Sequence, residues 1–153
     1  MGIVMKGNYF FVSRGEPAFE VASNYTNYLE LGTPESGSHY LRARIEEGEF
    51  AIDADLYDSH GNHLCRVVDN LPQGGNCRKE MTTSGWQIFG PTDDLVLGVE
   101  VHDNVCSIRG VLYDSKGEKV AEGNEDTLLI HKGPAVLGKA GNALGMVIGL
   151  ASS

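Results

Sequence analysis

Two histidines and a cysteine lie close together in the chain and could bind a metal ion. His60, His63 and Cys65 carry imidazole and thiol donors, which suit zinc and other borderline or soft metals. A structural zinc site needs four ligands at characteristic spacings, whereas this segment offers three. We therefore expect His60 and His63 to be exposed turn residues, and the sequence predicts no metal site and no cofactor.

Asp53 and Asp55 could act together as an acid and a base. They alternate on a predicted strand, so both carboxylates share a face, and paired carboxylates can catalyse hydrolysis or hold Ca²⁺. The segment lacks the Gly-centred loop of a calcium site, which favours a solvated strand face. One alternative function is a small hydrolase or isomerase with a site in a barrel mouth, built from this pair, His39 or His102. That alternative requires a pocket in which polar groups converge.

Residues 133–140 nearly match the phosphate-binding pattern G-x-x-x-x-G-K-[ST]. The last position is Ala140, which has no hydroxyl to bind Mg²⁺. A phosphate-binding loop must also lead into a helix, and the glycine-rich residues that follow are poor helix formers. We therefore expect a connection between two strands here and no nucleotide site.

Aromatic and amide side chains offer another kind of site, because rigid rings and orienting amides can bind a sugar or a protein. Tyr25, Asn27 and Tyr28 are clustered, and Tyr40 and Trp86 lie elsewhere in the chain. These five are the candidate ligand-binding residues. A carbohydrate-binding module that uses Trp86 and the Tyr/Asn cluster is the second alternative function.

A repeated turn sequence must position these groups. Leu-Tyr-Asp-Ser-His-Gly at 56–61 returns at 112–117 with lysine in place of histidine. An aspartate at the start of a turn accepts backbone N–H bonds, and a glycine at its end adopts positive φ without a steric penalty. The repeat therefore predicts structural turns, with no catalytic residue among them. The turn residues are Asp58, Gly61, Asp114, Gly117 and, in a fainter copy, Gly15.

Apolar residues alternate with polar ones on both sides of these turns, as they do in half-buried strands. Residues 41–70 align without a gap on 97–126 with seven identities, which indicates a duplicated β-meander. A weaker related hairpin covers 8–24, and the longest irregular connections are expected at 71–83 and 132–141. No segment shows a helical period. We predict a single all-β domain over 1–153, an antiparallel β-sandwich or small β-barrel.

The composition limits the partners. The formal net charge of −9 argues against a nucleic acid or an anionic membrane as partner, and the chain has no run of clustered Lys and Arg that would neutralise phosphates. No apolar run reaches the length of a membrane span, and residues 1–6 are no signal peptide. We therefore expect a cytoplasmic protein whose three cysteines, Cys65, Cys77 and Cys106, are reduced. A Cys65–Cys77 disulfide is the alternative if the protein is exported.

Taken together, these patterns favour a non-catalytic β-domain over an enzyme. We expect it to bind an unknown protein or small ligand, or to associate with a second copy of itself. The glycine-spaced apolar stretch at 141–150 is the expected contact surface for such a homo-oligomer.

Overall fold

The computed structural model describes residues 2–6, 9–12, 25–32, 40–46, 49–102, 105–124, 127–132, 135–138 and 145–148. Within these ranges every regular element is a β-strand, which confirms the predicted all-β class. None of the described segments forms a helix long and apolar enough to cross a membrane. The strands are β1 (Gly2–Lys6), β2 (Tyr9–Val12), β3 (Tyr25–Thr26), β4 (Tyr28–Leu31), β5 (Leu41–Glu46), β6 (Glu49–Tyr57), β7 (His63–Val68), β8 (Leu71–Gln73), β9 (Arg78–Met81), β10 (Gly85–Phe89), β11 (Leu95–His102), β12 (Val105–Tyr113), β13 (Lys119–Gly123), β14 (Thr127–Ile130), β15 (Ala135–Gly138) and β16 (Gly145–Ile148).

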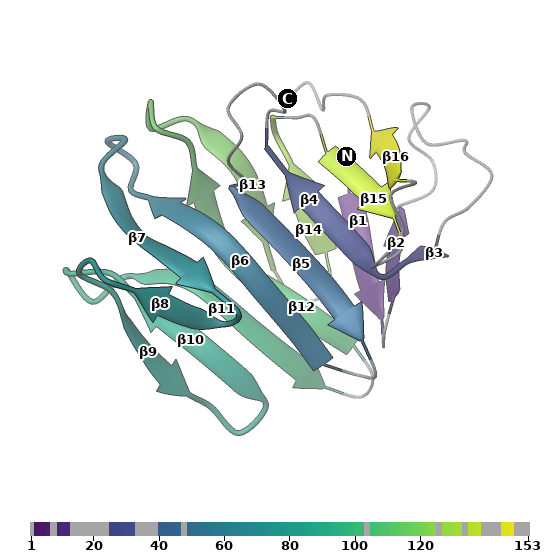
Figure 1. The fold of residues 1–153 in the computed structure, drawn as a ribbon, viewed down its shortest axis with the longest axis horizontal. Helices are drawn as coiled ribbons and strands as arrows, with labels where there is room; N and C mark the ends of the chain where they lie inside the picture. The colour runs from purple at the N-terminus through teal and green to yellow at the C-terminus, as the bar shows by residue number, and fades with distance from the viewer. Residues whose placement is uncertain are drawn as a thin grey trace.

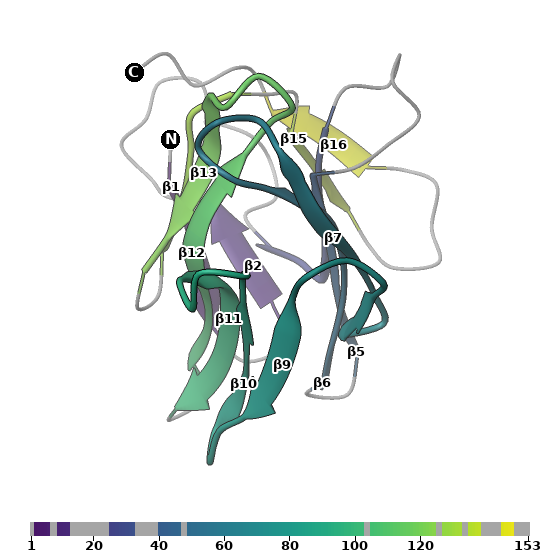
Figure 2. The same ribbon diagram turned by 90° about the vertical axis from the view of Figure 1, so that its left-hand side faces the viewer.

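The strands form two antiparallel sheets that pack face to face, so the structure is a β-sandwich (Figures 1 and 2). One sheet has nine strands in the order β3-β2-β1-β14-β13-β12-β11-β10-β9. The other has seven, in the order β16-β15-β4-β5-β6-β7-β8. The sequence predicted either a sandwich or a small barrel. The structure has two separate sheets, as a sandwich does.

The core lies between the sheets and follows from the alternation in the sequence. On β6, Phe50, Ile52, Ala54 and Leu56 are buried, and the residues between them are half-buried. Large aliphatic side chains from the facing sheet complete the core, and each contributes roughly 1.5–3 kcal/mol by its burial. These facing side chains include Ile88, Leu97, Ile108 and Leu128.

The two segments aligned in the sequence have the same strand order and the same pairing register. Arg42 pairs with Asp53 in β5–β6, and Gly98 pairs with Arg109 fifty-six residues later in β11–β12. The register shifts just before Tyr57 in one segment and just before Tyr113 in the other.

The common origin of the segments stays a prediction. The single-domain boundaries are likewise untested, and the hairpin predicted at 8–24 lies mostly outside the described residues, with Gly15 among those not described.

Three short strands lie where irregular connections were expected. β8 and β9 occupy parts of 71–83, and β15 occupies part of 132–141. β8 and β9 each end a sheet, and exposed apolar side chains such as Leu71 and Met81 break the usual inward pattern there. Edge strands pair on one side only, so the sequence carries a weaker periodic signal for them.

The β7–β8 hairpin turns through two residues with positive φ, Asp69 (47°) and Asn70 (67°), which match the right-handed twist of the strands. The Asn70 amide also clamps this turn onto β6. Its Oδ1 accepts the Ile52 N–H at 2.8 Å, and its Nδ2 donates to the Phe50 carbonyl at 2.7 Å. One side chain therefore satisfies two backbone groups of the neighbouring strand.

Replacing Asn70 by alanine should lower the free energy of unfolding by about 2 kcal/mol, because two partly buried backbone groups lose their partner. Asn70→Gly is the matched control for the backbone, since glycine accepts the positive φ and removes the same two hydrogen bonds. Urea unfolding of both variants separates the two contributions. Equal stability of the wild type and Asn70→Gly would contradict the clamp.

Candidate functional site

The two repeated turns have the same internal hydrogen bonds. Asp58 Oδ1 accepts the backbone N–H groups of His60 and Asn62 at 2.8 and 2.9 Å. Asp114 Oδ1 accepts those of Lys116 and Glu118, both at 2.9 Å. Each aspartate thus holds the turn that follows it.

The turns also pack against each other, backbone to backbone, where the two sheets meet (Figures 1 and 2). A Cβ added at Gly61 would lie 2.5 Å from the Ser115 carbonyl oxygen. One added at Gly117 would lie 2.5 Å from the Ser59 carbonyl oxygen. The contact is reciprocal, because each glycine lies against the serine carbonyl of the other turn. We call this pair of segments, 58–61 and 114–117, the paired turns.

A cleft of about 380 Å³ lies beside the paired turns, a size that suits a small organic ligand. Tyr57 and Tyr113, which precede the two turn aspartates, both line it. Val96 and Val111 add aliphatic wall. The first paired turn and the loop between β10 and β11 supply polar groups, namely Asp58, Thr92 and Asp94.

The carboxylates of the cleft already have partners within the protein. The pKa of the Asp58 carboxyl lies below its ordinary value, and the hydrogen bond from the Asn62 backbone N–H is the largest cause. Two further hydrogen bonds lower the pKa in the same direction, and together they outweigh the effect of desolvation. The Thr92 hydroxyl donates to Asp94 Oδ2 at 2.6 Å. Among the described residues that line the cleft there is no histidine, cysteine, lysine or arginine. The lining therefore offers negative charge and apolar surface, and none of its described residues is a histidine, cysteine or lysine that could act as a base or nucleophile near neutral pH.

A smaller pocket of about 190 Å³, lined by Tyr40 and the second paired turn, holds an ion pair in which the aspartate is buried and the lysine is partly exposed. The Asp114 side chain is 3% exposed, and Lys132 Nζ lies 2.5 Å from its Oδ2. Burial raises the pKa of the Asp114 carboxyl, but the Lys132 bond and two backbone N–H groups outweigh it, so the net pKa is lowered. The Asp114 and Glu118 carboxylates raise the pKa of Lys132. Both groups are charged at neutral pH and hold the turn to the end of β14.

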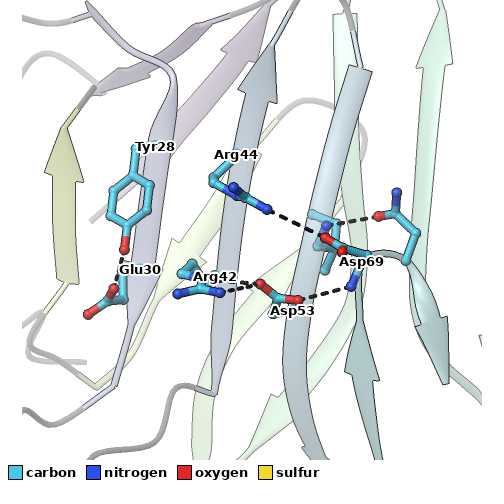
Figure 3. A network of polar contacts seen from close by, with 8 residues as sticks. Tyr28, Glu30, Arg42, Arg44, Asp53 and Asp69 are labelled. Carbon is cyan, nitrogen blue, oxygen red and sulfur yellow. Dashed lines mark hydrogen bonds and ion pairs between the residues drawn. The ribbon is translucent and has the colours of Figure 1, made fainter. Parts of the chain in front are cut away.

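Charged side chains cover the outer face of the seven-stranded sheet (Figure 3). Arg42 donates to Asp53 Oδ2 from Nε at 3.1 Å and from Nη2 at 2.6 Å, and the Asp69 N–H donates to Asp53 Oδ1. Burial raises the pKa of Asp53, but the hydrogen bonds have the larger combined effect, so the pKa is lowered overall. On the same face, Tyr28 donates to Glu30, and burial followed by that carboxylate raises the pKa of Tyr28 to about 12.

The candidate acid–base pair lies on this face beside a hollow of about 140 Å³. Asp53 is bound by Arg42 as described. Asp55 Oδ1 lies 3.2 Å from His63 Nε2 and 3.7 Å from Arg66 Nε. Each carboxylate is thus held by a neighbouring strand. His39 and the side chain of His102 lie outside the described residues.

The five candidate ligand-binding residues do not gather in one place. Trp86 is 6% exposed and lies in the core, with Lys79 Nζ 5.3 Å from its ring, so it offers no open platform. Tyr28 lies on the outer face of the opposite sheet. The rings of Tyr40 and Tyr57 make a T-shaped contact with their centroids 6.1 Å apart, so Tyr40 lies next to the cleft that Tyr57 lines. The backbone of Tyr25 belongs to β3, and the Asn27 carbonyl accepts the Ile45 N–H.

The histidine–cysteine cluster is not assembled for metal binding in the described part of the chain, where no group of three or more His, Cys, Asp and Glu side chains converges. His63 contacts Asp55 and the Tyr57 ring, and His60 is exposed. Cys65 and Cys77 are free thiols, and Cys65 is buried. Burial and a hydrogen bond with Cys77 raise the pKa of the Cys65 thiol, so it stays protonated and unreactive.

Sequence reasoning did not single out Tyr57, Tyr113, Thr92 and Asp94 as site residues. The signal for the tyrosines was present, since each stands directly before a repeated turn aspartate. Thr92 and Asp94 belong to the loop between β10 and β11, which is distant from both paired turns in the sequence. Only the folded chain brings this loop to the cleft.

No protein-family model, curated protein or solved structure matches this chain. Its function is therefore inferred from the chemistry of the cleft.

Proposed function

We propose that this chain is a non-catalytic binding domain that takes up a small ligand in the cleft beside the paired turns. The observation that carries the proposal is the cleft itself. Its volume of about 380 Å³ falls within the range of small-molecule sites, and it combines aromatic and aliphatic walls with a few polar groups. The two tyrosines come from opposite sheets, so a ligand between them would contact both.

Binding fits the lining better than catalysis does. General acid–base catalysis needs a group that can exchange a proton near neutral pH and reach the substrate. Asp58 stays ionised and directs its oxygens to the turn, and Asp94 accepts the Thr92 hydroxyl. The carboxylates on the outer face are likewise held by arginines and a histidine. These groups can orient a ligand, whereas none of them is placed as a poised base.

Ser59 and Ser115 provide a matched pair for testing the proposal. Both are exposed and occupy the same place in the paired turns, but Ser59 lines the cleft and Ser115 lines the smaller pocket. Tryptophan at position 59 should obstruct the cleft, and tryptophan at 115 should leave it open.

We expect fragments that raise the melting temperature of the wild type to do so in Ser115→Trp and to lose the effect in Ser59→Trp. The measurement is a thermal-shift screen of a set of neutral, cationic and anionic fragments, with the unfolding curve of each ligand-free variant as the control for folding. Hits that stabilise both variants equally would contradict a ligand site in the cleft, as would the absence of any hit.

A further inference from the structure

The charge of the cleft indicates which class of ligand it would take, an inference that rests on the proposed binding function. We propose that the cleft binds a compact organic cation, an ammonium group carried on a small apolar body. The first support is electrostatic. Asp58 and Asp94 are the charged residues among those that line the cleft in the described structure, and both are acidic. The formal net charge of −9 adds a long-range attraction for cations.

The aromatic walls support the same class of ligand. Tyr57 and Tyr113 both line the cleft, and a cation placed over the face of either ring would be attracted within about 6 Å of the ring centre. The Tyr57 ring also makes T-shaped contacts with the rings of Tyr40 and His63. Leu64, Val96 and Val111 provide apolar surface for alkyl groups. An alkylated ammonium ion is weakly hydrated and donates few or no hydrogen bonds, so it loses little free energy of hydration when it enters such a cleft.

A sugar fits this lining less well. Sugar recognition uses several directional donors and acceptors, and amide, guanidinium and indole groups are absent from the described residues that line the cleft. The Thr92 hydroxyl there is already donated to Asp94.

A metal ion is also a poorer fit. Asp58 Oδ1 accepts two backbone N–H bonds and Oδ2 accepts the Asn62 amide at 3.1 Å, so a metal ion would compete with these hydrogen bonds for the carboxylate. Asp58 and Asp94 are also fewer carboxylates than a calcium site uses. An organic cation instead needs only the field of the carboxylates, with no oxygen released from its present partner.

Choline and its uncharged carbon analogue 3,3-dimethylbutan-1-ol test the proposal, because they have nearly the same shape and differ in charge. We expect choline to bind with a dissociation constant in the millimolar range and the alcohol to bind roughly tenfold more weakly, since it lacks the attraction to the rings and carboxylates. Amide chemical-shift titrations of the wild type and Ser59→Trp measure both affinities and locate the site.

Asp94 and Asp93 supply a matched pair of charge variants. Asp94→Asn removes a carboxylate from the cleft and keeps an acceptor for Thr92, so choline affinity should fall about threefold. Asp93→Asn removes the same charge one residue away, from a side chain that is paired with Arg78. Its affinity for choline should stay within about twofold of the wild type because the charge lies farther from the ligand.

The outcomes separate the two proposals. Equal binding of choline and the alcohol in the cleft overturns the cation proposal and leaves the binding function standing. Choline binding that survives in Ser59→Trp, or no binding of either compound, also overturns the cation proposal. In the last case the fragment screen decides whether the cleft binds another class of ligand.

Discussion

Replacing Gly61 by alanine should lower the free energy of unfolding by more than about 3 kcal/mol. Gly61 has φ of +84°, which costs an alanine about 1–2 kcal/mol. Its new Cβ would also lie 2.5 Å from the Ser115 carbonyl oxygen and 3.2 Å from the Gly117 nitrogen. Both obstacles are backbone atoms of the opposite turn, so the paired turns would have to separate. Urea unfolding monitored by tryptophan fluorescence measures the loss.

Gly74→Ala is the matched control for the backbone effect. Gly74 also has positive φ, at +61°, but a Cβ there would meet no atom within 4 Å. Gly74→Ala should therefore lower the free energy of unfolding by about 1–2 kcal/mol, the conformational part alone. Similar losses for Gly61→Ala and Gly74→Ala would contradict tight packing of the paired turns. The double variant Gly61→Ala/Gly117→Ala should lose less than the sum of the single losses, because the first substitution already opens the contact.

Replacing Asp114 by alanine should cost about 3 kcal/mol at neutral pH. The carboxylate is almost fully buried and accepts two backbone N–H groups, which would lose their partner, and the Lys132 ammonium, which would keep only Glu118. Asp58→Ala removes the same turn bonds from a less buried carboxylate that pairs with no lysine among the described residues, and its loss should be clearly smaller. Equal losses in the two variants would contradict a special role for the Asp114–Lys132 pair.

The Asp114 contribution should also depend on pH in a defined direction. Its pKa is lowered in the folded protein, so ionised Asp114 stabilises the fold fully above the unfolded pKa of about 4. That stabilisation is lost as the pH falls from there through the folded pKa. The stability gap between wild type and Asp114→Asn should therefore be constant between about pH 5 and 8 and shrink toward pH 3. A gap that widens on acidification would contradict this assignment.

The strands near the repeated turns could be predicted from the sequence because their signal is local. Alternation of apolar and polar residues along β5 and β6 determines which face each side chain takes, and Asp58 and Gly61 determine the turn between β6 and β7. The edge strands β8 and β9 were not predicted, because pairing on one side leaves little pattern.

The cleft could not be predicted, because it depends on how two distant hairpins meet. Nothing near Tyr57 in the sequence indicates that Tyr113 and the loop at Asp94 line the same cleft. Trp86 was singled out from its residue type, and its burial depends on the strand that carries it. Tryptophan is common in sugar sites, yet this one alternates inward on β10 and is spent on the core.

Mapping of amide chemical shifts with the strongest hits of the fragment screen is the most direct test of the central claim that the cleft beside the paired turns is the functional site. The expected result is a continuous set of perturbed amides at Tyr57, Ser59, Val96 and Val111, weakened in Ser59→Trp and retained in Ser115→Trp. Perturbations centred on Arg42 and Asp53 of the outer face, with the cleft unchanged, would contradict it.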